Sequence, residues 1–222
     1  MAIIVGGTND GWCRSPLGSW SSSRNHAGDS FDSNNTTDTA AVACYYFARR
    51  GNFYQIRAFF EFDTSGISVA PSAATLKISG TASDWADVIV VRSEQGGTLA
   101  AGDFNSFPAA AVTALGNSDG SGAGTFAGIS GLTYSAEIAT WSTSGYNDIA
   151  LNATALADMV SLSLFKVCLM EYDYDYLDIA GGSPSNRIGL RWTENGDTKW
   201  PYIDYTAAVT VTDNATFFGA NF

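Results

Sequence analysis

The chain has 222 residues, a formal net charge of −11, a hydrophobic fraction of 45% and a charged fraction of 15%. These proportions exclude a disordered chain and allow a sizeable core without disulfide bonds. The acidic balance argues against nucleic-acid and anionic-membrane partners, which need a surplus of Lys and Arg, and no window reaches the roughly 20 apolar residues of a membrane span.

The first forty residues are the least regular part of the pattern. Residues 1–40 are rich in Gly, Ser, Asn and Asp, and we predict that they form an irregular N-terminal arm before one domain over 41–222. The start "MAIIVGGTNDGW" has no basic region and only a short apolar stretch. We therefore expect no secretion signal.

Strand patterns begin at "TAAVACYYFA", 39–48, and "RRGN" favours a turn after it. Residues 54–62 then alternate, with an apolar face and a face that includes Gln55, Arg57 and Glu61, which predicts a half-buried strand. Further strand patterns follow at 73–82 and 87–97. "NATALADM", 152–159, predicts a short helix with Asn152 as its N-cap.

Strand patterns also fill most of the remaining chain, and no long window has a helical period. The fold class predicted from them is all-β: a single jelly-roll β-sandwich of about eight to ten strands, with the irregular arm and one short helix.

Three cysteines, Cys13, Cys44 and Cys168, are odd in number and have no metal-ligand spacing. Cys168 lies in the apolar run "LFKVCLM" and is expected to be buried. Cys13 and Cys44 could pair, but the lack of a secretion signal favours the reduced state.

The segment "MEYDYDYLD", 170–178, holds four carboxylates and three tyrosines. Phe165, Val167 and Leu169 share the face that we expect to meet the core. An unbroken strand would place Glu171, Asp173 and Asp175 on that same face, where unpaired carboxylates are too costly. We predict either that a bulge at about Met170–Glu171 reverses the direction of the side chains or that the strand leaves the sandwich there. In both cases the tyrosines pack on the protein and the acids face solvent or an ion.

Acidic clusters at a rim are candidate calcium sites, because calcium takes six to eight oxygen ligands. One candidate set is Asp173, Asp175 and Asp178, and a second contains Asp29 and Asp32. The alternative is that these are solvated turn acids on a very acidic surface.

Exposed aromatic rings are candidate platforms for sugars, and Trp85, Trp192 and Tyr174 are the candidates that we select. The alternative is that most tryptophans close the ends of the core. The only histidine, His26, lies in the loop-like "SRNHAGDS", and no "GxSxG" motif is present, so we expect no Ser–His–Asp catalysis. Paired carboxylates would still permit glycoside hydrolysis.

Several segments together resemble a known family. "RAFFEFDTSGI" followed by "AATLKI" resembles the opening segment "RaLLrFDLSsIP…ItSAtLrL" of DNRLRE-type carbohydrate-binding modules. "GYNDIALNATALADM" resembles their "gWntfDVTaLV", and "KWPYIDYTA" resembles their closing strand. The resemblance covers roughly residues 55–210 and implies a calcium-containing jelly roll. The "SRE"-like segment is replaced by "LRWTENGDTKW". A layout with "LMEYDYDYLD" before a final "PYIDYT" is similar to structural proteins of tailed bacteriophages.

The function predicted from these features is a non-enzymatic virion component, either a capsid decoration protein or a tail or fibre protein, with a glycan-binding capacity. Its expected partners are other virion proteins, copies of itself in a homo-oligomer, with a trimer favoured, and a host-surface glycan. The expected location is the virion, assembled in the host cytoplasm. The alternatives are an extracellular carbohydrate-binding module and a glycan hydrolase.

Overall fold

The computed structural model describes residues 2–33, 36–84, 87–116, 121, 123–179, 185–195 and 199–208. Its strands are β1 (Ala2–Val5), β2 (Gly11–Leu17), β3 (Ser30–Asp32), β4 (Thr37–Phe47), β5 (Asn52–Asp63), β6 (Ala73–Asp84), β7 (Val88–Arg92), β8 (Tyr146–Ala150), β9 (Leu164–Glu171), β10 (Ser185–Arg191) and β11 (Tyr202–Thr206). Its α-helices are α1 (Trp20–Asn25), α2 (Ala109–Leu115) and α3 (Ala153–Ser161), and its shorter helical turns are η1 (Ala101–Asn105), η2 (Tyr172–Tyr176) and η3 (Thr193–Asn195).

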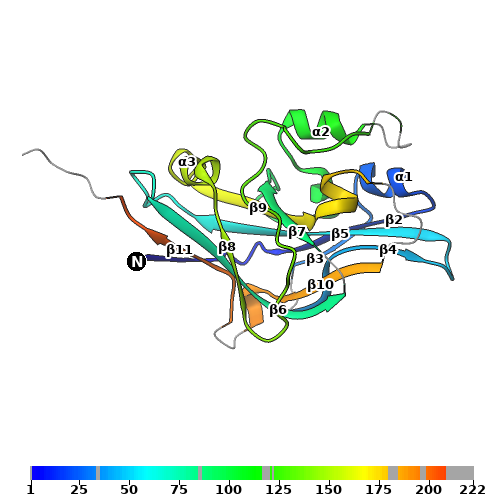
Figure 1. The fold of residues 1–222 in the computed structure, drawn as a ribbon, viewed down its shortest axis with the longest axis horizontal. Helices are drawn as coiled ribbons and strands as arrows, with labels where there is room; N and C mark the ends of the chain where they lie inside the picture. The colour runs from blue at the N-terminus through cyan, green and yellow to red at the C-terminus, as the bar shows by residue number, and fades with distance from the viewer. Residues whose placement is uncertain are drawn as a thin grey trace, which may run out of the picture.

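Two antiparallel sheets share the long strand β6 (Figure 1). Residues 73–79 of β6 lie between β11 and β8, and β1 pairs with β11 at the end of this first sheet. Residues 80–83 of β6 pair with β10, which leads through β4, β5 and β2 to β3 in the second sheet. The predicted all-β sandwich class is confirmed, while jelly-roll connectivity stays a prediction.

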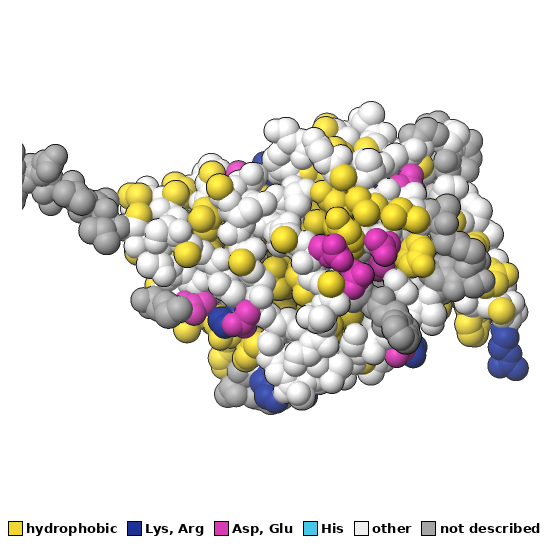
Figure 2. Space-filling view, in the orientation of Figure 1, with side chains coloured by type: hydrophobic (Ala, Val, Ile, Leu, Met, Phe, Trp, Pro, Cys, Tyr) yellow, Lys and Arg dark blue, Asp and Glu magenta, His cyan; other side chains and the backbone are white. Residues whose placement is uncertain are grey.

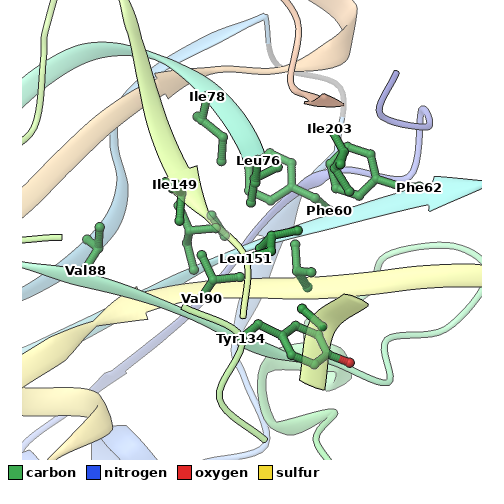
Figure 3. Close-up of a cluster of buried hydrophobic side chains, with 14 of the residues drawn as sticks. Phe60, Phe62, Leu76, Ile78, Val88, Val90, Tyr134, Ile149, Leu151 and Ile203 are labelled. Carbon is green, nitrogen blue, oxygen red and sulfur yellow. The ribbon is translucent and has the colours of Figure 1, made fainter. Parts of the chain in front are cut away.

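A first hydrophobic core lies between the two sheets. Figure 3 shows Phe60 and Phe62 of β5 near Leu76 of β6 and Ile203 of β11. A second core lies on the opposite face of the second sheet, under η1 and α2, and contains Phe59 and Cys168. The strands β5, β7 and β9 therefore bury side chains on both faces, which explains the continuous apolar run of β7.

The central strand β5 differs from the half-buried strand predicted at 54–62. Its second face is also buried, because Gln55, Arg57 and Phe59 are each 0% exposed. Helices and turns cover that face in Figure 1. Arg57 is consequently a buried cation, which the alternating pattern alone did not reveal.

The irregular arm predicted over 1–40 is wrong for the described part of that segment. β1 pairs with β11, β2 is paired on both sides by β3 and β5, and α1 packs beside β2. Small residues explain the error: Ser15 and Ser23 are fully buried, although Ser is typical of loops. The segment is part of the sandwich.

The predicted helix is confirmed as α3, where the Asn152 side chain accepts a hydrogen bond from the Ala155 N–H at 3.1 Å. α1 and α2 are additional helices, and the eleven strands in the described part of the chain slightly exceed the predicted number. All three cysteines are free and buried in the structure, and the reduced state stays a prediction. Among the described residues, no helix has the length and apolarity needed to cross a membrane.

Candidate functional site: an acidic turn and an arginine pocket

The acidic segment 170–178, called the acidic turn below, begins where β9 ends. β9 stops at Glu171, and Tyr172–Tyr176 form one π-helical turn, so of the two predicted alternatives the exit of the strand is the one observed. The Leu177 N–H closes the turn by donating to the Tyr172 carbonyl at 2.9 Å. This change from extended to helical backbone places Asp175 back under the sheet, where its side chain is buried.

Asp175 forms a buried, two-armed ion pair with Arg57 of β5. Arg57 Nε lies 2.6 Å from Asp175 Oδ2, and Nη2 lies 2.6 Å from Oδ1. The side chains are only 0% and 3% exposed. A planar guanidinium matches a carboxylate in this paired arrangement, and such charge-assisted bonds are strong in a buried setting.

Arg57 also uses its remaining N–H groups. Nη1 donates to the Phe104 carbonyl and to Asn105 Oδ1, each at 2.7 Å, and Nη2 donates to the Arg24 carbonyl at 3.2 Å. All five guanidinium donors therefore have partners, as a buried arginine requires. Arg57 joins β5, α1, η1 and the acidic turn.

Arg24 of α1 is a second buried cation at the acidic turn. Its Nε donates to the Asp175 carbonyl at 2.6 Å, and its Nη1 lies 3.5 Å from Asp178 Oδ1. Its guanidinium carbon lies 4.9 Å from the centre of the Phe126 ring. Burial lowers the pKa of Arg24, and the charges of Asp175 and Asp178 oppose that change.

Glu171 caps the π-helical turn from inside the protein, with 1% of its surface exposed. It accepts hydrogen bonds from the Tyr174 N–H at 2.5 Å and from Asn186 Nδ2 at 2.9 Å. Burial raises its pKa to about 7; the two hydrogen bonds act in the opposite direction, and the charges of Asp175 and Asp173 raise the pKa further.

The raised pKa of Glu171 predicts a pH dependence of stability. Between its ordinary pKa of 4.5 and about 7, folded Glu171 holds a proton that the unfolded chain releases. The stabilisation from Glu171 is therefore complete below the ordinary pKa and is lost as the pH rises through the folded value. Glu171→Gln keeps the carbonyl acceptor, so we expect its melting temperature to fall less than that of the wild type between about pH 5 and pH 8.

Thermal unfolding at a series of pH values measures this difference. Burial and the nearby charge of Glu194 also raise the pKa of Asp10. Asp10 is present in both proteins, so it contributes equally to both curves. Equal slopes for the wild type and Glu171→Gln would contradict a role for buried Glu171 in the pH dependence.

The structure does not gather the proposed calcium ligands of the acidic turn. Asp175 and Asp178 face arginines, and Glu171 is buried against protein donors. The expectation that the acids of the segment face solvent or an ion is therefore wrong for Glu171 and Asp175. Asp173 is half-exposed. Burial raises the pKa of Asp87 and of Glu137, and the negative charge of Asp173 raises both further. Figure 2 shows acidic side chains gathered near the middle of the visible face.

The second proposed calcium set lies elsewhere. Asp29 is exposed, with its N–H bonded to the Arg14 carbonyl at 2.8 Å, and Asp32 is the last residue of β3, paired with Trp12. Within the described ranges, no three Asp, Glu, His or Cys side chains are grouped to hold a metal ion. Calcium binding stays a prediction, without support from this geometry.

The three predicted glycan-stacking residues have different positions. Trp192 is 1% exposed and stacks on Phe60 with ring centres 5.3 Å apart, so its interpretation as a sugar platform is wrong and the core interpretation holds. Tyr174 is half-buried and packs edge-on against Trp20 at 5.6 Å. Trp85 lies outside the described residues.

A second candidate site lies at the end of the sandwich where the β4–β5 hairpin projects, at the right of Figure 1. A cavity of about 370 Å³ there is called the arginine pocket, and its lining residues are Arg14, Ala40, Tyr45, Phe47, Arg50, Tyr54 and Arg187. Figure 2 shows dark-blue Lys or Arg side chains at this end of the molecule. Three of the chain's eleven Lys and Arg residues line this one cavity.

Strand register brings the lining residues of the arginine pocket onto one face of the second sheet. Tyr45 of β4 pairs with Tyr54 of β5, and their rings stack with centres 5.0 Å apart and planes 4° apart. Arg14 of β2 pairs with Ile56, two residues beyond Tyr54, so it lies on the same face. Arg187 of β10 pairs with Ala43 of β4, two residues before Tyr45. Because side chains two residues apart on a strand share a face, Arg187 also lies on this face.

The cations of the arginine pocket differ from the buried arginines. The Arg14 guanidinium carbon lies 5.6 Å from the centre of the Tyr54 ring, and Arg50 Nη1 lies 3.5 Å from the Tyr54 hydroxyl. No ion pair joins Arg14 or Arg50 to a carboxylate in the described part of the chain. Arg187 pairs with Asp84 at 2.6 Å, but their side chains are 52% and 45% exposed.

Sequence reasoning missed both groups of arginines. Arg57 looked like a residue on a polar strand face, while Arg14 lay in the predicted arm. Arg50 lies in the predicted turn "RRGN" and Tyr54 follows it closely, and that proximity is a local signal that could have been used. The contribution of Arg187 depends on pairing with β4, far away along the chain.

The chain matches no protein-family model and no curated protein in the comparisons made with it. The likeness to DNRLRE-type modules stays a prediction. Function is therefore inferred from the acidic turn and the arginine pocket themselves.

Proposed function

We propose that this protein is a non-enzymatic structural component of a tailed-bacteriophage virion, in the capsid decoration, the tail or its fibres. The observation that carries the non-enzymatic part is the engagement of Asp175 by Arg57. The acidic turn is a dense group of carboxylates, but Asp175 has both oxygens bound by a buried guanidinium. A carboxylate held in this way is not available as a base or nucleophile.

The virion context is supported by the sequence resemblance to tailed-phage structural proteins, in which "LMEYDYDYLD" precedes a final "PYIDYT". Assembly with copies of itself is supported by β1, the last strand of the first sheet. Ile3 and Val5 of β1 are 63% and 44% exposed. An edge strand with exposed apolar side chains suits pairing or packing with another subunit, and a trimer is the favoured assembly.

Mass spectrometry of gradient-purified virions tests this proposal. We expect peptides of this chain to co-purify with the major capsid and tail proteins at a constant ratio across the particle peak. If the chain is abundant in the infected lysate but none of its peptides are detected in the particle peak, the virion role is rejected.

A secreted carbohydrate-binding module is the second candidate, and the arginine pocket is the observation that favours it. Its aromatic rings and cations lie on a sheet face, where a sugar ring would find both stacking and hydrogen-bonding partners. Neighbouring genes for polysaccharide degradation, in place of capsid, portal or tail genes, would favour this candidate.

A further inference from the structure

We infer that the arginine pocket binds a short acidic saccharide, with its carboxylate or sulfate group held by Arg14 and Arg50 and its ring placed on the aromatic wall. This inference does not depend on the virion role, because the pocket would act in the same way in a secreted protein. The calcium and tryptophan candidates named from the sequence do not include it.

The charge distribution is the first argument. The chain carries a net charge of −11, yet Arg14, Arg50 and Arg187 converge on one cavity. Placing like charges together is unfavourable unless a counter-charge joins them. Since no described carboxylate pairs with Arg14 or Arg50, an external anion is the partner that fits.

Arg187 can also bind the same anion with little loss of stability. Its ion pair with Asp84 involves two half-exposed side chains, and such surface pairs contribute little to stability. Arg187 can therefore exchange Asp84 for a ligand carboxylate or sulfate without a large loss. Arg14 is better fixed, because its Nε donates to Ser30 Oγ at 3.1 Å.

The aromatic rings argue for a saccharide over a simple anion. Tyr45 and Tyr54 are stacked almost parallel, and Phe47 meets Tyr54 edge-on with ring centres 6.2 Å apart. Phe47 is 39% exposed at the tip of β4. An exposed ring beside hydrogen-bond donors suits the apolar face and the polar edge of a sugar.

The rest of the surface argues against a long nucleic acid. Double-stranded DNA carries one charge per about 1.7 Å of its axis and needs a basic surface along its length. This chain offers one local basic cavity on a strongly acidic protein. A ligand with one or two acidic groups is the size and charge that the cavity matches.

Two neighbouring arginines provide a matched pair of variants. Arg49 and Arg50 are both exposed and share the β4–β5 turn, but only Arg50 lines the arginine pocket. Arg49→Gln and Arg50→Gln remove the same charge from the same turn. We expect Arg50→Gln to weaken binding at least about tenfold through the loss of a charge-assisted contact. Arg49→Gln should change it by less than about twofold because of screening.

Titration calorimetry with the full chain supplies the test. The probes are oligosaccharides of one backbone that carry a carboxylate, a sulfate ester or no charge, together with inorganic sulfate. We expect both acidic forms, or one of them, to bind, and the neutral form and inorganic sulfate to bind at least about tenfold more weakly. Phe47→Ala should weaken the binding of the acidic saccharide and leave the binding of inorganic sulfate unchanged.

Thermal unfolding of each variant shows that it is folded before binding is compared. The inference is overturned if no acidic oligosaccharide binds, if the neutral form binds equally, or if Arg49→Gln and Arg50→Gln weaken binding to the same extent. Equal binding of inorganic sulfate, or preferred binding of a short oligonucleotide, would also overturn it.

Discussion

Asp175→Ala should lower the free energy of unfolding by about 3–5 kcal/mol, because it leaves Arg57 as a buried cation without its carboxylate. Arg57 is 0% exposed and cannot turn toward water without breaking its bonds to η1 and α1. Arg24 would lose a neighbouring negative charge at the same time. Urea unfolding of the wild type and the variant, followed by tryptophan fluorescence, measures the change.

Asp148→Ala is the matched control for an ion pair at the surface. Asp148 lies 2.6 Å from Lys77, the same separation as Asp175 from Arg57, but its side chain is 58% exposed. We expect a cost of at most about 1 kcal/mol for this control. Similar losses for Asp148→Ala and Asp175→Ala would contradict the expected cost of leaving Arg57 buried without its carboxylate.

Trp192→Ala should destabilise the protein by about 3–5 kcal/mol through a cavity in the core between the sheets. Trp192 is 1% exposed, stacks on Phe60, and donates from Nε1 to Asp38 Oδ2 at 2.8 Å. Removal of the ring also leaves Asp38 without that donor. The same urea experiment measures the loss.

Val69→Ala is a control for apolar truncation at the surface, because Val69 is 46% exposed. Its expected effect stays within about 0.5 kcal/mol. A small loss for Trp192→Ala, together with weaker binding of an acidic saccharide, would instead favour the original interpretation of Trp192 as a sugar platform.

The alternation of side chains was enough to predict the strand β5 and an interruption of β9 at about Met170–Glu171, as either a bulge or an exit. Phe165, Val167 and Leu169 face the core as expected, and β9 does end at Glu171. The alternation of side chains along β9 showed that an unbroken strand would place unpaired acids in the core. It could not show where those acids would go, because the partner of Asp175 lies 118 positions away on β5.

Composition was a poorer guide than alternation at the N-terminus. A segment rich in Ser, Gly and Asn is usually a loop, but in β2 its small side chains fit between packed layers. Cys13 and Ser15 are both 0% exposed there. Short strands of this kind gain their stability from neighbours on both sides, which a local pattern does not contain.

The arginine pocket could not be predicted from spacing, because β2, β4, β5 and β10 each supply part of it. Its local trace in the chain is the β4–β5 hairpin, which supplies Tyr45, Phe47, Arg50 and Tyr54. The chemistry of the pocket depends on strand order and register, and both come from pairing over long distances.

Stability and saccharide binding measured side by side in Asp175→Ala and Arg50→Gln test the division between a structural turn and a binding pocket most directly. We predict that Asp175→Ala loses stability but, where it is folded, binds the acidic saccharide as the wild type does. We predict that Arg50→Gln keeps its stability and loses binding. Loss of binding in folded Asp175→Ala, with Arg50→Gln unaffected, would contradict this division and make the acidic turn the site.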